Sequence, residues 1–213
     1  MKRIIFGVTD LADVLFFELQ QRGIEVDAFC VNRQFKEEEN HCGLQVVTYE
    51  ELDTKDDIGI YICVGYHSMN QARAKIYQDL KRKKVKILSF IHESAIVMTN
   101  QIGEGCLIFE NAVIGPYTKI GNANIFYPKS MVSHHSIVGD FNFFAISSSV
   151  AGRVVVKNYC FIGNNATTKD KIEIADYTLV GAGAYVKEDT KEKTCIVPAE
   201  SVVLEKHAST ELI

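Results

Sequence analysis

The sequence lacks an excess of basic residues, a long apolar run and closely spaced cysteines. Its 23 lysines and arginines are outnumbered by 27 aspartates and glutamates, so no basic surface is offered to nucleic acid. No apolar run approaches the ~18 residues that a membrane span needs, and Asp10 comes too early for the apolar core of a signal peptide. We therefore expect a cytoplasmic protein that binds neither nucleic acid nor membranes.

The six cysteines are also not arranged as pairs. They occupy positions 30, 42, 63, 106, 160 and 195 without a Cys-x-x-Cys spacing, and several lie inside apolar runs. This pattern predicts buried, reduced thiols, and neither a disulfide framework nor a zinc site. His41 lies in an acidic loop and is expected to be exposed, without a functional role.

The first ninety residues alternate between short apolar runs and helical patterns. Apolar residues within 10–22 recur with the spacing of one helix face, and Gly23 follows them. Strand, helix, strand and helix in this order favour a small parallel sheet, a Rossmann-like half-unit. The expected elements are strands at 3–8, 26–31, 58–64 and 85–90, helices at 10–22 and 70–84, and an exposed loop at 35–41.

A period of six residues replaces this pattern after residue 90. Every sixth residue from Ile102 to Val186 is aliphatic or aromatic except Thr168, and the register extends back to Ile96 and Phe90. A β-sandwich would not demand so strict a period. A small residue usually stands four places after the apolar one, and glycine often follows the apolar one directly, at positions 103, 115, 121, 139, 163 and 181.

This period predicts a triangular solenoid, the left-handed parallel β-helix of hexapeptide-repeat proteins. The apolar residue points inward, the small residue sits at a corner, and glycine permits backbone geometry that other residues resist. Three hexads complete one coil, so 96–186 holds about five coils. The expected domains are a Rossmann-like domain at 1–90, a β-helix at 91–188 and a C-terminal extension at 189–213.

His134 and His135 are the clearest candidates for chemistry. They follow the inward-facing Val132, where the coil turns a corner and side chains project outward. No cysteine or carboxylate stands beside them at metal-ligand spacing, so a metal is not expected. A histidine titrates near neutral pH and is the usual proton acceptor for an amine or a hydroxyl, which makes the pair a candidate general base.

Motifs in both halves of the chain carry a family resemblance. The most specific is 130–141, Ser-Met-Val-Ser-His-His-Ser-Ile-Val-Gly-Asp-Phe. Further motifs are Gly7-Val8-Thr9, Gly65, Ala151-Gly152, 161–167 (Phe-Ile-Gly-Asn-Asn-Ala-Thr) and 179–184 (Leu-Val-Gly-Ala-Gly-Ala). Together these segments resemble the bacterial sugar acyltransferases typified by NeuD and PglD, over essentially the whole chain.

The resemblance implies transfer of an acetyl group from acetyl-CoA to the amino group of a UDP- or dTDP-linked amino-deoxy sugar, in O-antigen or other surface-glycan biosynthesis. It also implies a homotrimer with active sites between neighbouring chains. In this resemblance His134 matches the general base, and the backbone N–H of Gly152 matches the group that contacts the thioester oxygen. Phe143, Asn164 and Ala182 match further acyl-CoA positions.

The nucleotide sugar is expected to bind the N-terminal domain, at Gly7, Thr9, Asp10, Asn32, Gly65 and Tyr66. Asn70 and Arg73 are further candidates, because the loop after a third parallel strand opens onto the ligand crevice. Helix capping by Asn70 and a surface position for Arg73 explain these two residues equally well.

Two departures from the family pattern stand out. His135 stands where many members carry a carboxylate that orients the base; a neutral imidazole can accept a hydrogen bond but supplies no fixed negative charge. In addition, Thr9-Asp10-Leu11 stands where a Ser-Gly-His run is common.

Other functions remain open from the sequence. The same base would serve an O-acetyltransferase of a sialic acid-type sugar, and the acyl donor could be longer than acetyl-CoA. A non-catalytic scaffold would bind no acyl-CoA and would tolerate loss of His134. A nicotinamide-dependent oxidoreductase is disfavoured, because the turn after the first strand has Gly7 without the other glycines of a dinucleotide-binding motif.

Overall fold

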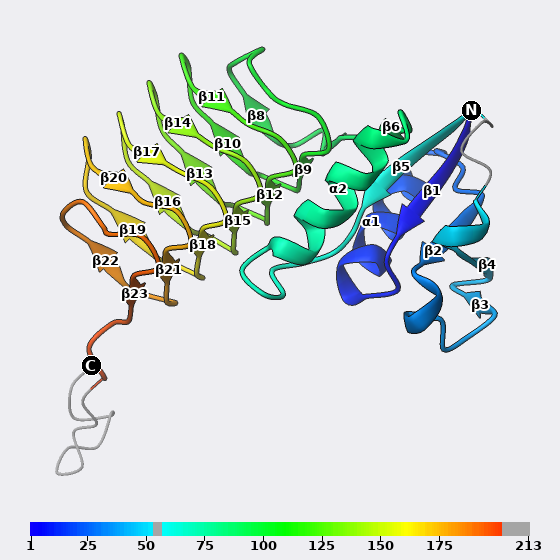
Figure 1. The fold of residues 1–213 in the computed structure, drawn as a ribbon. Coiled ribbons are helices and arrows are strands. Elements are labelled where there is room, and N and C mark those ends of the chain that lie inside the picture. Colours follow the sequence, from blue (N-terminus) through cyan, green and yellow to red (C-terminus); the bar gives the residue numbers. More distant parts are fainter. Residues whose placement is uncertain (53–56, 202–213) are drawn as a thin grey trace, which may run out of the picture.

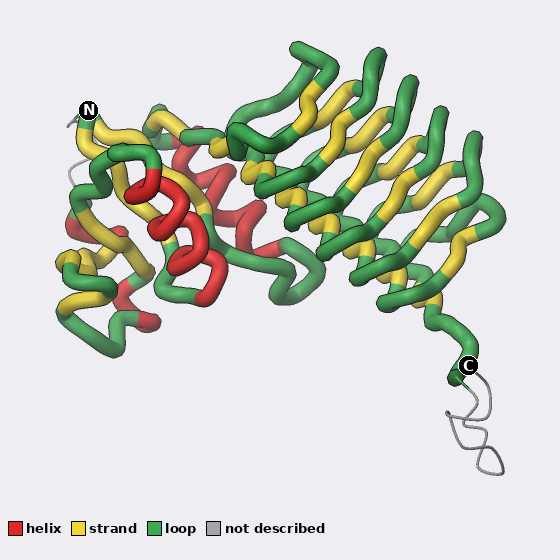
Figure 2. The backbone as a smooth tube through the Cα atoms, turned by 180° about the vertical axis from the view of Figure 1, so that it is seen from behind, coloured by secondary structure: helices red, strands yellow, loops and turns green. Residues whose placement is uncertain are grey.

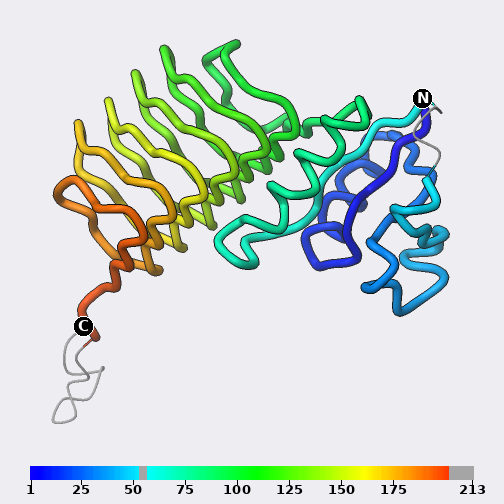
Figure 3. The backbone as a smooth tube through the Cα atoms, in the orientation of Figure 1, coloured from blue at the N-terminus to red at the C-terminus, as the bar shows by residue number. Residues whose placement is uncertain are grey.

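The computed structural model describes residues 1–52 and 57–201. An N-terminal sheet with two helices comes first, and a column of short stacked strands follows it (Figure 1). The coils of this column succeed one another in chain order, away from the N-terminal part (Figure 3). Within the described ranges, no helix is both long and apolar enough to cross a membrane.

The N-terminal part is a six-stranded sheet. Its elements are β1 (Lys2–Phe6), α1 (Asp10–Gln21), β2 (Ala28–Val31), η1 (Arg33–Phe35), β3 (Asn40–His41), β4 (Leu44–Thr48), η2 (Tyr49–Glu51), β5 (Ile58–Ile62), α2 (Gln71–Arg82) and β6 (Lys86–Ile87). The strand order is β3-β4-β2-β1-β5-β6, and all neighbours are parallel except the β3–β4 hairpin. The expected strands and helices match β1, β2, β5, β6, α1 and α2. The hairpin was not predicted, and β3 lies in the stretch expected to be a loop.

The helices α1 and α2 cover opposite faces of this sheet. Leu15 and Leu19 of α1 pack in one apolar cluster with Ile5, whereas Leu80 of α2 packs in another with Ile4. Adjacent residues of a strand point to opposite faces, so β1 contributes to both clusters.

The second part is a parallel β-helix of two-residue strands (Figure 2). They form three parallel sheets, ordered β8-β10-β13-β16-β19-β22 (sheet I), β11-β14-β17-β20 (sheet II) and β7-β9-β12-β15-β18-β21-β23 (sheet III). Their bounds are β7 Phe90–Ile91, β8 Ile96–Val97, β9 Leu107–Ile108, β10 Val113–Ile114, β11 Lys119–Ile120, β12 Ile125–Phe126, β13 Met131–Val132, β14 Ile137–Val138, β15 Phe143–Phe144, β16 Ser149–Val150, β17 Val155–Val156, β18 Phe161–Ile162, β19 Thr167–Thr168, β20 Glu173–Ile174, β21 Leu179–Val180, β22 Tyr185–Val186 and β23 Cys195–Ile196. This arrangement fits the left-handed β-helix that the sequence predicts.

The predicted inward series forms the core of the β-helix. Its members from Ile108 to Val186 are buried, Thr168 included, and Ile102 packs against them. Equivalent residues pair eighteen positions apart, as Val132 does with Val150. The six-residue period is therefore confirmed from Ile102 onward.

The register before Ile102 differs from the prediction. Val97, rather than Ile96, packs against the core, and Phe90 belongs to the cluster shared with the N-terminal part. Val97 pairs with Ile114, seventeen positions away. The first coil is thus one residue short, and the predicted extension of the register to Ile96 and Phe90 is wrong.

The glycines that follow the apolar positions also act differently from the prediction. Non-glycine residues adopt the left-handed backbone conformation at the corners, as His135 (φ +58°) and Arg153 (φ +61°) do. A Cβ on Gly139 would lie 2.7 Å from the carbonyl oxygen of Lys157 on the next coil. Glycine is required there by the close approach of two coils, not by an unusual φ.

Arg73 of α2 is fully buried where the two parts meet. Its Nε donates to the Ala123 carbonyl (2.9 Å) and its Nη2 to the Asn142 carbonyl (3.1 Å), both in the β-helix. Asn70 is buried as well, and its Nδ2 donates to the Cys160 carbonyl (3.1 Å). The expectations of a surface Arg73 and of substrate contact at Asn70 and Arg73 are therefore wrong.

All six cysteines are free. Four are buried, as predicted, and burial raises the pKa of each of these thiols: Cys30, Cys63, Cys106 and Cys160. Cys42 and Cys195 are exposed, so the prediction of burial is wrong for these two.

Candidate active site

His134 and His135 lie at the corner between β13 and β14, with both side chains exposed. The left-handed conformation of His135 turns the chain at this corner, and its backbone N–H donates to the Pro116 carbonyl (3.0 Å) one coil before. The backbone is thus anchored on the β-helix while both imidazoles project outward. This is the placement that the hexad phase predicts.

The two imidazoles contact each other. Their Nδ1 atoms are 3.1 Å apart, and the ring planes meet at 87°. His135 also lies against the Tyr117 ring, with centroids 4.7 Å apart. Loss of hydration, with smaller contributions from the positive charges of Arg153 and His134, lowers the pKa of His135. A lowered pKa favours the neutral imidazole, which can accept a hydrogen bond.

Gly152 lies against the His134 ring, one coil further along. A Cβ on Gly152 would lie 2.7 Å from Nε2 and 2.6 Å from Cε1 of His134. No residue larger than glycine fits there without displacing the imidazole. The backbone N–H of Arg153 donates to the His134 carbonyl (2.9 Å), which fixes the two coils against each other.

The backbone N–H of Gly152 donates to no atom of the residues that the structure describes. Equivalent N–H groups at another corner are capped by side chains of the next coil. Asp140 Oδ1 accepts from the Asn122 N–H (2.6 Å), and Asn158 Oδ1 accepts from the Asp140 N–H (2.8 Å). The corner of His134 thus presents an imidazole and a free backbone donor side by side.

Thr168 holds the backbone next to Gly152. Its side chain is buried, and its Oγ1 accepts from the Ala151 N–H (3.0 Å). The sequence signal for this role is that Thr168 is the only polar member of the inward series. The sequence alone does not assign it to the site.

The remaining candidate acyl-CoA residues lie at other places on the β-helix. Asn164 and Ala182 are exposed at one corner, between sheets III and I, on consecutive coils. Phe143 is 2% exposed, in the cluster that faces the N-terminal part. The structure therefore brings His134, His135 and Gly152 together but does not bring Phe143 to their corner.

The candidate nucleotide-binding residues lie at the carboxyl ends of the parallel strands of the N-terminal sheet. The strands β1, β2 and β5 are parallel, and Phe6 pairs with Cys30 on one side and Ile62 on the other. Gly7, Asn32 and Gly65 follow the three strands, whose carboxyl ends lie side by side, so they lie at the same end of the sheet.

The turn from β1 to α1 depends on Gly7 and Thr9. Gly7 has φ +126°, and a Cβ there would lie 2.5 Å from the Cys63 carbonyl oxygen. Thr9 caps α1, since its Oγ1 accepts from the Ala12 N–H (3.2 Å) and donates to the Cys63 carbonyl (3.1 Å). Asp10, the first residue of α1, is exposed.

Tyr66 connects this end of the sheet to the β-helix. Its ring packs edge-on against Phe143 (centroids 5.1 Å apart) and Phe161 (4.9 Å). The side chain is still 58% exposed. A candidate nucleotide residue and a candidate acyl-CoA residue are therefore in contact.

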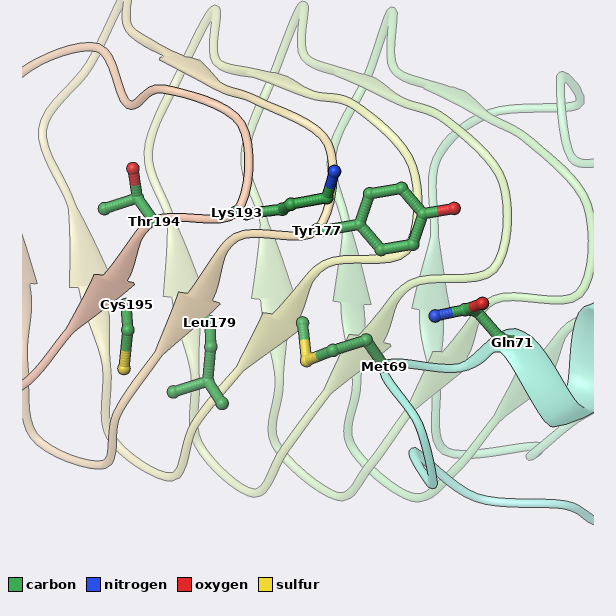
Figure 4. Close-up of a pocket in the computed structure, with 7 residues that line it drawn as sticks. All are labelled: Met69, Gln71, Tyr177, Leu179, Lys193, Thr194 and Cys195. Atoms are coloured by element: carbon green, nitrogen blue, oxygen red, sulfur yellow. The ribbon is translucent and has the colours of Figure 1, made fainter.

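A surface cavity of about 560 Å³ lies between the start of α2 and the last coils (Figure 4). Met69 and Gln71 line it on one side, and Tyr177, Lys193 and Cys195 on the other. None of these residues was singled out from the sequence, because the cavity exists only through the packing of distant segments.

No protein-family model matches the chain, and no curated protein matches it. Solved structures do match over both parts. WeeI from Acinetobacter baumannii AYE has a TM-score of 0.83 at 20% identity and covers 93% of this chain and 97% of its own.

Two further matches carry bound molecules. The acetyltransferase domain of PglB from Neisseria gonorrhoeae FA1090, in complex with acetyl coenzyme A, has a TM-score of 0.81 at 18% identity, covering 93% of this chain and 98% of its own. PerB from Caulobacter crescentus, in complex with CoA and GDP-perosamine, has a TM-score of 0.80 at 23% identity, covering 92% and 93%. At these identities the likeness shows a shared fold, which agrees with the resemblance seen in the sequence.

Proposed function

We propose that this chain is an acetyl-CoA-dependent N-acetyltransferase that acts on the amino group of a nucleotide-linked amino-deoxy sugar in surface-glycan biosynthesis. The observation that carries the proposal is the corner where the His134 ring lies against Gly152, beside an unpaired N–H. The solved neighbours support it, because one is an acetyltransferase domain with acetyl coenzyme A and another holds CoA with an amino sugar nucleotide, GDP-perosamine.

His134 is the general base in this proposal. Neutral His135 accepts the Nδ1–H of His134 at its own Nδ1, across 3.1 Å. This hydrogen bond leaves the lone pair on Nε2 of His134, which faces the position of the reacting groups beside Gly152. His135 thus takes over the orienting role of the carboxylate found in the family, without a fixed charge.

The reaction then needs two contributions from the chain. The sugar amine attacks the thioester carbonyl, and Nε2 of His134 takes up the amine proton as the N–C bond forms. The C–S bond then breaks, and CoA leaves and takes up this proton as its thiol. The free N–H of Gly152 donates to the carbonyl oxygen, where negative charge develops during attack.

We assign the nucleotide to the N-terminal domain, at 1–90. Its parallel strands β4-β2-β1-β5-β6 have the order of a Rossmann-like sheet, in which ligands bind at the carboxyl ends of the strands where the order reverses. That point lies between β1 and β5, next to Gly7, Thr9 and Gly65. Asn32, Asp10 and Tyr66 lie around it and would select the base and the sugar.

We further propose a homotrimer formed by the β-helix, which the sequence places at 91–188 and whose strands continue to β23 (Cys195–Ile196). Met131 (38% exposed) and Ile137 (46% exposed) flank the His134 corner with apolar side chains, which a neighbouring chain would cover. The six free thiols fit the reducing cytoplasm. The extension at 189–213 is described only as far as residue 201.

The proposal is tested by thiol release from acetyl-CoA with a panel of UDP-, dTDP- and GDP-linked amino sugars, each paired with its hydroxyl counterpart. We expect turnover with one amino sugar and none with its hydroxyl counterpart. Turnover only with a hydroxyl sugar would instead favour O-acetylation, and turnover only with a longer acyl-CoA would change the donor. Absence of turnover together with absence of acetyl-CoA binding would favour the scaffold.

A further inference from the structure

A cluster of side chains of the types that can ligate a metal lies at the tip of the β3–β4 hairpin, away from the His134 corner. It consists of His41 at the end of β3, Cys42 in the turn, and Asp13 on α1. One ligand atom from each lies within 4.8 Å of those of the other two. Spacing along the sequence could not reveal this cluster, because Asp13 is 28 residues from His41. The His41 side chain is 19% exposed, so the expectation of an exposed histidine is wrong.

The distances from Asp13 to the other two residues bracket the ligand separations of a zinc site. Asp13 Oδ1 lies 2.6 Å from His41 Nε2 and 3.9 Å from Cys42 Sγ. Ligand atoms of a tetrahedral zinc ion lie roughly 3.3–3.8 Å from one another, as follows from metal–ligand bonds of about 2.0–2.3 Å. Asp13 and Cys42 are exposed, so their side chains have room to rotate, and Asp13 Oδ1 would move away from His41 Nε2 to reach these separations.

His41 is already held in the orientation that a metal ligand needs. Its Nδ1 lies 2.6 Å from Glu38 Oε1, and its ring packs edge-on against Phe29, with centroids 4.9 Å apart. Glu38 accepts the Nδ1–H, and Nε2 faces Asp13, whose carboxylate accepts the Nε2–H at 2.6 Å and raises the pKa of His41. A metal ion would take the place of the proton on Nε2. A carboxylate behind a histidine ligand is the common outer partner in zinc sites.

The hairpin turn places a cysteine where its backbone does not favour one. Cys42 and Gly43 both have positive φ, +48° and +81°, as the two central residues of a type I′ turn do. Asn-Gly or Asp-Gly is preferred in this turn. The backbone gives no reason for cysteine at position 42, whereas its thiol completes the ligand set.

We propose that Asp13, His41 and Cys42 bind one zinc ion, with Glu38 positioning His41 and a fourth coordination position open to water. A thiolate, an imidazole and a carboxylate are ligands that zinc accepts, whereas magnesium and calcium prefer oxygen alone. Binding requires loss of the Cys42 proton, and the two anionic ligands then balance the charge of the ion. The ion ties the β3–β4 hairpin to α1. This site is independent of the acyl-transfer proposal.

The test is calorimetric titration of the metal-free full chain with zinc, and with magnesium as a second arm. We expect one equivalent of zinc and no magnesium to bind. Cys42→Ser and His41→Gln should abolish binding or weaken it by more than Glu38→Gln does, for which the expected loss is about 10–100-fold. Cys195→Ser replaces the other exposed cysteine and should bind zinc as the wild type does.

A second measurement needs no variant. Zinc should protect Cys42 from alkylation, read by mass spectrometry of the labelled peptides, while Cys195 in the same molecule is labelled at an unchanged rate. Equal labelling of Cys42 with and without zinc, or equal zinc affinity in the wild type and Cys42→Ser, would overturn the proposal.

Discussion

Gly152 has a steric role that can be separated from its backbone donor. In Gly152→Ala the N–H remains, but the added methyl group would lie 2.6–2.7 Å from the His134 ring and must displace it. Displacements of about 1 Å cost on the order of 100-fold in rate, so we expect that loss in kcat/KM with little change in thermal stability.

A double-mutant cycle provides the control for this prediction. If Gly152→Ala acts by displacing the imidazole, it should add little to the loss already caused by His134→Ala. Losses that multiply in the double variant would show that the methyl group acts on something other than His134.

His135 is a positioning residue, so its variants should alter the pH profile as well as the rate. Asn is a good replacement because it tolerates the left-handed backbone at φ +58° and offers a carbonyl acceptor, whereas His135→Leu offers none. We expect His135→Asn to retain more activity than His135→Leu.

The pH dependence follows from the lowered pKa of His135. His135 stays neutral at pH values below 6.5, the ordinary pKa of histidine. Only in more acidic solution does it take up a proton, after which its Nδ1 can no longer accept a hydrogen bond. In the wild type, protonation of His135 should contribute to the fall of kcat/KM at acid pH. This contribution should be absent in His135→Asn. An identical acid limb in both proteins would argue against the hydrogen bond to His134.

Among single residues, those fixed by the hexad phase were the predictable ones. The phase alone places His134 and His135 at an outward corner, and Gly152 comes from the family motif. Arg73 could not be predicted, because its burial depends on carbonyls at positions 123 and 142 that only the assembled fold brings to it. His41 was misjudged for the same reason.

Among the elements, α2 is attached to the sheet by a hydrogen bond that should respond to acid. The Tyr49 hydroxyl in η2 donates to Asp79 Oδ2 on α2 (2.6 Å), and this bond is the main cause that lowers the pKa of Asp79 from 3.8 to about 2. Because the pKa of Asp79 is lower in the folded protein than in the unfolded chain, its charged carboxylate contributes its full stabilisation above pH 3.8. This stabilisation is lost as the pH falls towards about 2.

Tyr49→Phe should weaken this dependence. We expect the free energy of unfolding at pH 7, measured with denaturant, to be about 1 kcal/mol lower than in the wild type. Between pH 4 and about pH 2, this free energy should also fall less steeply than in the wild type. Superimposable slopes in the two proteins would mean that Asp79 owes its low pKa to Arg82 and Lys83 instead.

The sequence predicted repeated elements better than single ones. One period shared by many hexads specifies the β-helix strands even though each is only two residues long. The one-residue shortening before Ile102 and the β3–β4 hairpin each occur once, so no repetition reveals them. The hairpin also depends on a Cys-Gly turn, a poorer signal than Asn-Gly.

For the whole molecule, the attachment of the N-terminal part to the β-helix depends strongly on Arg73. Its guanidinium donates to the Val64 and Gly65 carbonyls in the N-terminal part as well as to Ala123 and Asn142 in the β-helix. Lysine carries the same charge but cannot reach acceptors in this forked arrangement.

We therefore expect Arg73→Lys to destabilise the protein by about 3 kcal/mol or more, because several hydrogen bonds from a charged donor are lost and buried carbonyls are left without a partner. Denaturant unfolding checks this, with Lys75→Ala on the exposed face of α2 as the control. A midpoint for Arg73→Lys equal to that of Lys75→Ala would show that Arg73 does not hold the two parts together.

The most direct test of the central claim is the rate of acetyl transfer in His134→Ala, measured by thiol release with the amino sugar that the wild type accepts. Lys75→Ala serves as the control. The account predicts a loss of at least ~100-fold in kcat for His134→Ala, with acetyl-CoA binding and thermal stability retained because His134 is an exposed base. Transfer at the wild-type rate in a folded His134→Ala protein would contradict the account and place the base elsewhere.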